Sequence, residues 1–488
     1  MPKIVQPIVL LAMLAGCTVG PNYAGPPTAA PHAAQAGAPF VRATSDNVAT
    51  PPVARWWEAL GDPSLNALVV RALANNPNLA IVQARLRQAR ASLREEKANA
   101  RPNGSASAVY AHARVPGLDL TGSNDSGNGT SGTTTDAGSQ SDRTTQFDLY
   151  NLGFDASWEI DLFGGQRRAI EGARANAAAA QANIADAQVS LTSEVAQAYV
   201  NLRDRQQRIA LNARSVTMQE QMLALTQQRF QRGTASRLDV TRLQNQLDNT
   251  RADITPLNAD LDSYLDELAT LTGDEPGFLD QSLKAPQPLP MPPATVSVGD
   301  PAALLARRPD IRAAERRLAA ATAKIGQAEA AKFPSLKFMG IIGLGGTDPT
   351  DLTKLDDFTV LLAPQLSWNF LDFGRNRARV AQADAARDEA EAQFKQSVLG
   401  ALRDAEDALS RFKYRRVTVA TLARAKASAD QAAALSEQRY EAGTTTLIDL
   451  LDTRRQQIAA DQSLSQGKAA LTGDFISIQK ALGLGWSS

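Results

Sequence analysis

Few side chains in this chain of 488 residues could do chemistry. It has two histidines, His32 and His112, and a single cysteine, Cys17, so zinc and copper sites are strongly disfavoured and no internal disulfide can form. Asp449 and Asp452 are three residues apart and would share a helix face. No histidine lies near a nucleophile, however, and neither a GxSxG motif nor a phosphate-binding loop occurs. We predict a protein that is not an enzyme and uses no metal or cofactor.

The composition points to long helices. Lysine and arginine together number 51, as do aspartate and glutamate, so the chain carries no basic footprint for nucleic acid. Aromatic residues make up only 5%, while alanine, glutamine, arginine, aspartate and leucine are plentiful. This composition suits long helices better than a β-sandwich or a doubly wound sheet.

The N-terminus has the pattern of a targeting segment, which we place at residues 1–16. The apolar stretch IVLLAML is too short to span a bilayer, and it leads into LAGC, which ends at Cys17. This ending resembles the bacterial lipoprotein signal, which implies that Cys17 becomes the first residue and carries acyl chains such as palmitate. Thr18 follows, not an aspartate, and by resemblance to sorted lipoproteins this favours the outer membrane. Residues 17–63 would then be a lipid-anchored segment; a plain signal peptide with an incidental cysteine is the alternative.

Three phrases of the sequence occur twice. QRFQRGTASRLDVTRLQN is matched by QRYEAGTTTLIDLLDTRR, SWEIDLFGGQRR by SWNFLDFGRNRA, and LANNPNLAIVQARLRQA by LARRPDIRAAERRLAAA. The pairs begin at Gln228 and Gln438, at Ser157 and Ser367, and at Leu73 and Leu305. Matched phrases in the same order indicate a tandem duplication.

We therefore expect two tandem structural repeats, at 64–272 and 301–482. A proline-rich connector at 273–300 joins them, and a short tail at 483–488 follows the second. The spacing of the matched phrases requires an insertion in the first repeat. That insertion is the Gly/Ser/Thr-rich stretch 122–141, which we interpret as a disordered surface loop.

Each repeat should contain a helix stopped by a proline, two strands, a very long helix and, after a Gly-Thr turn, a further helix. The stopping prolines are Pro102 and Pro334, and Pro256 is a potential kink in the last helix of the first repeat. The predicted helices are 64–100, 166–232 and 236–272 in the first repeat, and 301–332, 375–442 and 446–482 in the second. The longest of these would each extend roughly 100 Å.

The strands are predicted from alternation of apolar and polar residues. The apolar series are Leu152, Phe154, Ala156, Trp158, Ile160 and Leu162; Leu336, Phe338, Ile342 and Leu344; and Phe358, Val360, Leu362, Leu366, Trp368 and Phe370. A weaker strand is expected at 103–113, by analogy with the second repeat. A period of two with one polar face fits a transmembrane β-barrel, and equally an antiparallel sheet on a soluble core.

Helices too long for a compact domain favour the membrane interpretation, with Trp158 and Trp368 in an aromatic girdle. An open sheet edge in lipid would leave backbone groups unpaired, at several kcal/mol each. Four strands cannot close a barrel alone, so several chains must share one. With four strands each, two chains would give eight strands and three would give twelve.

The sequence resembles the outer membrane efflux proteins of the TolC type, and more closely the NodT group of lipoprotein channels. The resemblance covers essentially the whole chain, through LAGCTVGPNY, WWEALGDPSLNALV, the FG that opens each long helix, and the two turn phrases. It implies a mainly α fold with a membrane β-barrel: a homotrimer whose 12-stranded β-barrel is continued by a 12-helix α-barrel tunnel into the periplasm. The connector and terminal segments would form a collar around the tunnel.

The resemblance implies a passive exit duct for small molecules in a tripartite drug efflux system. An inner membrane pump of the RND type would deliver the compounds through a periplasmic adaptor, the membrane fusion protein. Alternatives are a duct for type I secretion of polypeptides, a metal-efflux variant and a structural tether. Lipidation and the GPNY start favour drug efflux, and the scarcity of methionine and histidine disfavours the metal variant.

The resemblance also assigns roles to residues at the helix tips. Gly233 with Thr234, and Gly443 with Thr444, would form the two turns at the periplasmic tip that face the adaptor. In each turn we expect the glycine in the left-handed conformation and the threonine as the cap of the next helix.

The second turn should also carry a periplasmic gate. Ile448, Asp449 and Asp452 match the apolar and acidic rings that line the family's constriction. Three copies would crowd these carboxylates into one narrow bore, which should raise some of their pKa values and attract cations. The alternative is that carboxylates in the first turns of a helix merely favour its positive end.

Polar links between the two turns hold part of the closed state in the family. The candidates for such links are Asp239 and Tyr440. Thr445 is the third candidate, and the weakest, because some relatives carry a linking arginine at its position.

Overall fold

The structure is a computed structural model that describes residues 18–33, 35, 37–44, 47–48, 53–116, 144–353, 356 and 358–486. Cys17, the targeting segment 1–16 and the loop 122–141 lie outside these residues. The chain forms two compact units. The first contains Met1–Tyr23, Ala91–Arg174 and Ala320–Ala386, and the second contains Ala24–Arg90, Ala175–Ala319 and Arg387–Ser488.

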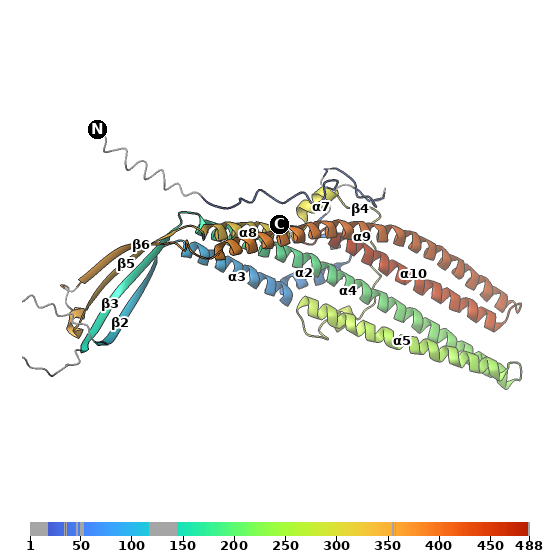
Figure 1. Ribbon diagram of the computed structural model, residues 1–488. Helices are drawn as coiled ribbons and strands as arrows, with labels where there is room; N and C mark the ends of the chain where they lie inside the picture. Colours follow the sequence, from blue (N-terminus) through green and yellow to red (C-terminus); the bar gives the residue numbers. More distant parts are fainter. Residues whose placement is uncertain are drawn as a thin grey trace, which may run out of the picture. The chain divides into compact units, whose positions relative to one another are not determined.

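Most of the chain is helical, and the second half follows the element order of the first (Figure 1). The first half contains α2 (Pro63–Asn75), α3 (Pro77–Asn99), β2 (Asn103–Pro116), β3 (Thr144–Ile160), α4 (Gly165–Gln231) and α5 (Arg237–Thr272). The second half contains α7 (Pro301–Arg307), α8 (Pro309–Ala330), β5 (Ser335–Gly346), η2 (Pro349–Thr353), β6 (Phe358–Ser367), α9 (Arg375–Glu441) and α10 (Leu447–Ala481). The remaining elements are β1 (Asn47–Val48) and η1 (Trp56–Leu60) before α2, and α6 (Asp280–Leu283) and β4 (Val296–Ser297) in the connector.

The first helix expected in each half is in fact two helices. Asn76, before Pro77, has φ −62° and ψ 125°, and Arg308, before Pro309, has φ −58° and ψ 126°. Proline disfavours helical dihedrals in the residue before it and lacks the N–H that would continue the ladder, so each helix restarts at the proline. The helix α5, by contrast, continues through Pro256.

The two long helices form as predicted because no proline interrupts them. Each of α4 and α9 contains 67 residues, within one residue of the bounds expected at both ends. At 1.5 Å per residue each is roughly 100 Å long.

The strands of the first unit form one antiparallel sheet in the order β2-β3-β5-β6, so β2 and β6 are its edges. The strands predicted to reach Leu162 and Phe370 are shorter, and end at Ile160 and Ser367. After β3 the N–H of Leu162 donates to the carbonyl of Ile160 at 2.9 Å, a tight turn that takes the backbone out of the ladder.

The two faces of the sheet differ in chemistry. Phe154, Ile342 and Val360 lie in one cross-strand row and are 68%, 47% and 62% exposed. On the opposite face Ser107 donates to Asp155 at 2.6 Å, and Lys337 lies 3.3 Å from Glu159. The predicted alternation is therefore present, with an apolar face that no described residue covers.

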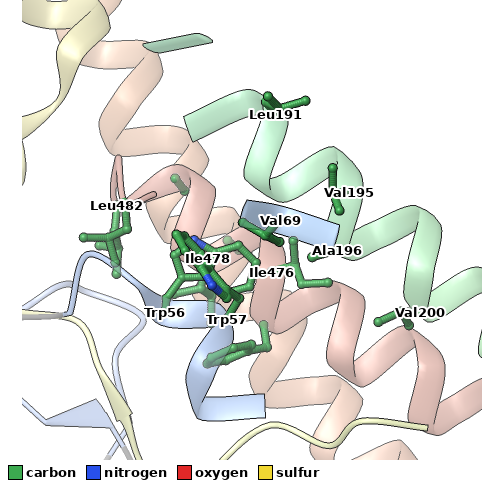
Figure 2. Close-up of a cluster of buried hydrophobic side chains, with 14 of the residues drawn as sticks. Trp56, Trp57, Val69, Leu191, Val195, Ala196, Val200, Ile476, Ile478 and Leu482 are labelled. Atoms are coloured by element: carbon green, nitrogen blue, oxygen red, sulfur yellow. The ribbon is translucent and has the colours of Figure 1, made fainter. Parts of the chain in front are cut away.

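The core of the second unit surrounds the middle of the long helices. Trp56 and Trp57 of η1 are buried, with ring centroids 5.9 Å apart at 80°, and Trp56 also meets Phe475 of α10 edge-on. Figure 2 shows this pair among Val69 of α2 and Ile478 of α10. Aromatic side chains bury the most apolar area per residue, so this short 3-10 turn ties the N-terminal segment to the helices.

The connector and the N-terminal segment are also held by polar contacts. The Tyr199 hydroxyl donates to Asp62 at 2.7 Å, and burial followed by this hydrogen bond raises the pKa of Tyr199 to about 12. Arg203, which is 1% exposed, donates to the carbonyls of Leu283 and Ala285 at 3.3 and 2.9 Å. A buried guanidinium bound to backbone carbonyls fixes the path of the connector across α4.

Candidate functional site

The candidate site lies at the two turns that join the paired long helices of the second unit. One turn connects α4 to α5 and the other connects α9 to α10, and Figure 1 shows both at the same end of these helices. The four glycine and threonine residues predicted for the tips are all exposed there.

The two turns have the same hydrogen bonds. The N–H of Gly233 donates to the carbonyl of Phe230, and the N–H of Thr234 donates to the carbonyl of Arg229, each at 2.9 Å. In the second turn the N–H of Gly443 donates to the carbonyl of Tyr440 at 3.0 Å, and the N–H of Thr444 donates to the carbonyl of Arg439 at 2.9 Å. These pairs are Schellman motifs, and the glycines have the φ of +74° and +70° that the motif requires.

The expectation that Thr234 and Thr444 cap the following helices is wrong. Their hydroxyls donate back to the carbonyls of Arg229 and Arg439, each at 3.1 Å, and so close the preceding helices. A cap must directly precede the first helical residue, and Ser236 holds that position before α5. Thr446 holds the same position before α10.

Two of the predicted acidic residues complete capping boxes. Asp239 accepts from the N–H of Ser236 at 3.1 Å, and Asp449 accepts from the N–H of Thr446 at 3.3 Å. The hydrogen bond from the Ser236 hydroxyl lowers the pKa of Asp239 below its usual value, and the hydrogen bond from the Thr446 hydroxyl does the same for Asp449. Thr445 also donates to Asp449, at 3.2 Å. Within one chain, therefore, Asp449 stabilises a helix start as an ionised carboxylate.

The other predicted gate residues are exposed beside this cap. Ile448 is exposed, and Asp452 pairs with Arg455 at 2.5 Å. Tyr440 reaches across to the first turn, where its hydroxyl accepts from Arg229 at 3.2 Å. A link between the two turns thus passes through Tyr440, whereas Asp239 bonds within its own turn.

An apolar cluster lies beneath the turns. It is formed by Met222, Leu223, Leu243, Leu247, Leu447 and Leu451, with Tyr440 packed against its edge. Because α4 and α5 contribute the first four and α10 the last two, the cluster joins the two helix pairs. The predicted gate residues are therefore on a helix start that is anchored by packed side chains.

Two partners of the site were missed by the sequence analysis. Arg455 lies three residues after Asp452, a spacing that places both on one helix face, so it could have been found. Arg229 contacts Tyr440 from the other half of the chain, and no local sequence pattern predicts a contact between residues so far apart.

A second group of contacts lies in the first unit and involves Val19, Gly20 and Asn22, which follow the predicted lipidation site in the sequence. Arg168 is 3% exposed and donates to the carbonyls of Val19 and Gly20 at 3.3 and 3.1 Å, and to the side chain of Asn22 at 2.7 Å. A Cβ added to Gly20 would lie 2.5 Å from the Cα of Gly326 in α8. The segment 19–22 is therefore held closely against α4 and α8.

The described residues offer neither a metal site nor a membrane-spanning helix. They contain no group of three or more histidine, cysteine or acidic side chains that could hold a metal ion. In the same part of the chain, no helix combines the length and apolar character needed to cross a membrane.

Comparison with known proteins gives consistent matches. A family model described as outer membrane efflux protein matches residues 68–274 and 301–484. Nodulation protein T of Rhizobium leguminosarum bv. trifolii is 30% identical, over 97% of this chain and 96% of its own. The pyoverdine export outer membrane protein OpmQ of Pseudomonas aeruginosa is 30% identical, over 89% of this chain and 88% of its own. The solved structure of the outer-membrane channel OprN matches with a TM-score of 0.84 and 32% identity, covering 96% of this chain and 100% of that one.

Proposed function

Because the chain belongs to the outer membrane efflux protein family, we propose that it forms the exit duct of a tripartite system that exports small molecules. Membership places the chain in the outer membrane, in a family of transport proteins that are not enzymes. In the proposal an RND-type inner membrane pump supplies the compounds, and a periplasmic adaptor joins the pump to the helix tips. A passive duct needs no cofactor, so the choice of compound rests with the pump.

The observation that carries the proposal is the four-stranded sheet with an exposed apolar face and two unpaired edges. In lipid such edges must be paired, because unpaired backbone groups there cost several kcal/mol each. Three copies joined edge to edge form a 12-stranded barrel, which their helices continue as a 12-helix tunnel. The relatives compared above do not favour the alternative of polypeptide secretion.

We assign the parts of the chain accordingly. Residues 64–272 and 301–482 act as tandem repeats, supported by their shared order of elements. The connector 273–300 forms the collar, supported by the contacts of Arg203 with Leu283 and Ala285. Residues 17–63 are the lipid-anchored segment, with Cys17 acylated.

The test of the duct is the mass and conductance of the full chain. After extraction in mild detergent, native mass measurement should give three chains, and the same preparation should conduct ions in planar bilayers. A conducting monomer would refute the shared barrel, and a trimer without conductance would indicate a tether instead of a duct.

Lipidation is tested separately. Wild-type cells should incorporate radiolabelled palmitate into the protein, and the Cys17→Ser variant should not. The variant should still assemble, because the barrel itself anchors the chain. Equal labelling of the two proteins would leave Cys17 as an incidental residue after a plain signal peptide.

At the tips we propose a gate formed by Ile448, Asp449 and Asp452 in each copy. Single-channel recording at low salt should show weaker cation selectivity when Asp449→Ala and Asp452→Ala are combined. Arg455→Ala should act in the opposite direction, because it removes the cation that pairs with Asp452. The matched control is Asp239→Ala, which removes the same kind of capping carboxylate from the other turn. Unchanged selectivity and unchanged block by trivalent cations would leave both aspartates with a capping role alone.

A further inference from the structure

The junction between β6 and α9 presents a group of uncovered apolar side chains. Phe370, Leu371 and Phe373 are 76%, 70% and 92% exposed. Phe373 also has a φ of +50°, a left-handed conformation that bulky residues rarely adopt. An exposed aromatic side chain on a strained backbone suggests a contact that one copy of the chain does not contain.

The matching junction in the first half is covered. Phe163, between β3 and α4, stacks on Phe333 with ring centroids 4.6 Å apart and an interplanar angle of 15°. Phe333 lies just before β5, the strand that pairs with β3. The cover for this junction therefore comes from the corner before the neighbouring strand.

The two junctions share a tryptophan contact as well as a sequence pattern, although Phe373 has a left-handed φ and Phe163 does not. The indole N–H of Trp158 donates to the carbonyl of Ala100 at 3.3 Å, and that of Trp368 donates to the carbonyl of Lys332 at 3.0 Å. Ala100 therefore corresponds to Lys332, and the residues that directly follow them also correspond. Arg101 thus holds before β2 the place that Phe333 holds before β5.

The free edges of the sheet permit the same arrangement between copies. If β6 of one copy pairs with β2 of the next as β3 pairs with β5, Leu366 lies opposite Ala108 and Leu362 opposite His112. Every residue of β6 then has a partner within β2, and the β2 residues on the same face as Phe154 lie on the side of Leu362 and Leu366. The antiparallel alternation of the sheet also continues across the boundary.

We propose that Phe373 of one copy packs against the guanidinium of Arg101 of the next copy. The proposal rests on the shared barrel proposed above, and it names one residue contact by which neighbouring copies recognise each other. A guanidinium stacks well on an aromatic face, so the pair replaces the two phenylalanines of the first half. Arg101 is exposed, and no described residue forms an ion pair with it.

Cysteine cross-linking in the full-length protein tests this contact. Phe373→Cys combined with Arg101→Cys should give covalently linked oligomers on oxidation, up to three chains, while each single variant should give none. The matched control is Phe163→Cys with Phe333→Cys, which should link within one chain and run as a monomer. Phe373→Cys with Val109→Cys, farther along β2, should not link.

A charge exchange gives an independent measurement. Phe373→Glu paired with native Arg101 should keep the oligomer bound, whereas Arg101→Glu alone should lower the temperature at which the oligomer dissociates. Arg101→Phe should keep the wild-type dissociation temperature, because the first half already uses a phenylalanine pair at this position.

The outcomes separate the contact from the proposed function. Linked oligomers, or a lower dissociation temperature for Arg101→Glu that Arg101→Phe does not share, support the contact. A protein that is trimeric by native mass, with no link at the test pair and the same dissociation temperature for both Arg101 variants, overturns the contact and leaves the duct standing. A monomer by native mass overturns both.

Discussion

The turn after α4 and the turn after α9 are alike in backbone and different in surroundings. Both use a left-handed glycine, a Schellman motif and a capping box. Only the second has a tyrosine that reaches the other turn, Tyr440, where the first has Phe230. Only the second adds a donor to its capping carboxylate, Thr445, where the first has Ala235. The common part is what two helices need to reverse direction, and the added part is what a gate would need.

The largest effect should come from breaking the part that the turns share. Gly233→Pro and Gly443→Pro each demand a φ near −65° where the chain has about +70°, and each removes a hydrogen-bond donor. We expect each to destabilise its turn by roughly 3 kcal/mol or more. Efflux should fall with both variants while the protein remains in the outer membrane. Gly443→Asn is the control, because asparagine tolerates the left-handed region. Normal export and normal cross-linking to the adaptor in the proline variants would contradict the role of the tips.

A smaller effect is expected where the halves differ in packing. Leu451 is buried in the cluster beneath the turns, whereas the corresponding residue of the first half, Thr241, is exposed. Leu451→Thr should cost about 2–4 kcal/mol, through the lost apolar contacts and a buried hydroxyl. Hydrogen exchange should then accelerate at the start of α10 and remain unchanged at the start of α5. Equal acceleration of exchange at the starts of α5 and α10 would mean that the two helix pairs unfold locally as one cooperative unit.

The link between the turns should have a modest effect on stability and a clearer one on gating. Tyr440→Phe removes the hydrogen bond to Arg229 but keeps the ring, at a cost of about 1 kcal/mol or less for a pair near the surface. Channel recordings should show more frequent opening. The reciprocal variant Phe230→Tyr is the control, because it adds a hydroxyl at the position that has no such partner. Identical opening of Tyr440→Phe and the wild type would remove Tyr440 from the gate.

The smallest expected effect concerns pH. The pKa of Asp449 is depressed by Thr446 and then by Thr445, so its capping contribution is complete above its usual pKa of 3.8 and is lost as the pH falls through the lower, folded value. Thr445→Ala should raise the pKa of Asp449 toward 3.8, so the contribution is lost at a higher pH. Hydrogen exchange at the α10 start should show this shift, with the α5 start as the reference within the same molecule. No shift between variant and wild type would show that Thr445 adds nothing to the cap.

The sequence predicted those features that depend on local pattern. The bounds of α4 and α9 follow from an absence of proline, and the turns follow from Gly233 and Gly443. The prolines at 77 and 309 also indicate helix breaks. Because the apolar pattern continues across both prolines, a single continuous helix was predicted in each half. The true caps, Ser236 and Thr446, were misplaced because a threonine after the glycine was the more obvious candidate.

Contacts between distant parts of the chain were beyond the sequence. Arg229 and Tyr440 belong to different halves, and neither residue type predicts the other. The same holds for Arg168, which is buried because the segment around Val19 lies over it. Such contacts depend on which segments pack against each other. Periodicity in a single sequence shows which face of a helix is buried, but not which segment covers it.

Four of the five tryptophans of the chain give it a built-in optical probe. Trp56 and Trp57 are buried among apolar side chains, and their indole N–H groups make no hydrogen bond to any described residue. Trp158 and Trp368 are exposed, and each donates to a backbone carbonyl. Indole emission moves to longer wavelengths as its surroundings become more polar. The blue part of the fluorescence spectrum should therefore follow loosening of the N-terminal segment, while acrylamide or brominated lipid should quench the remainder first.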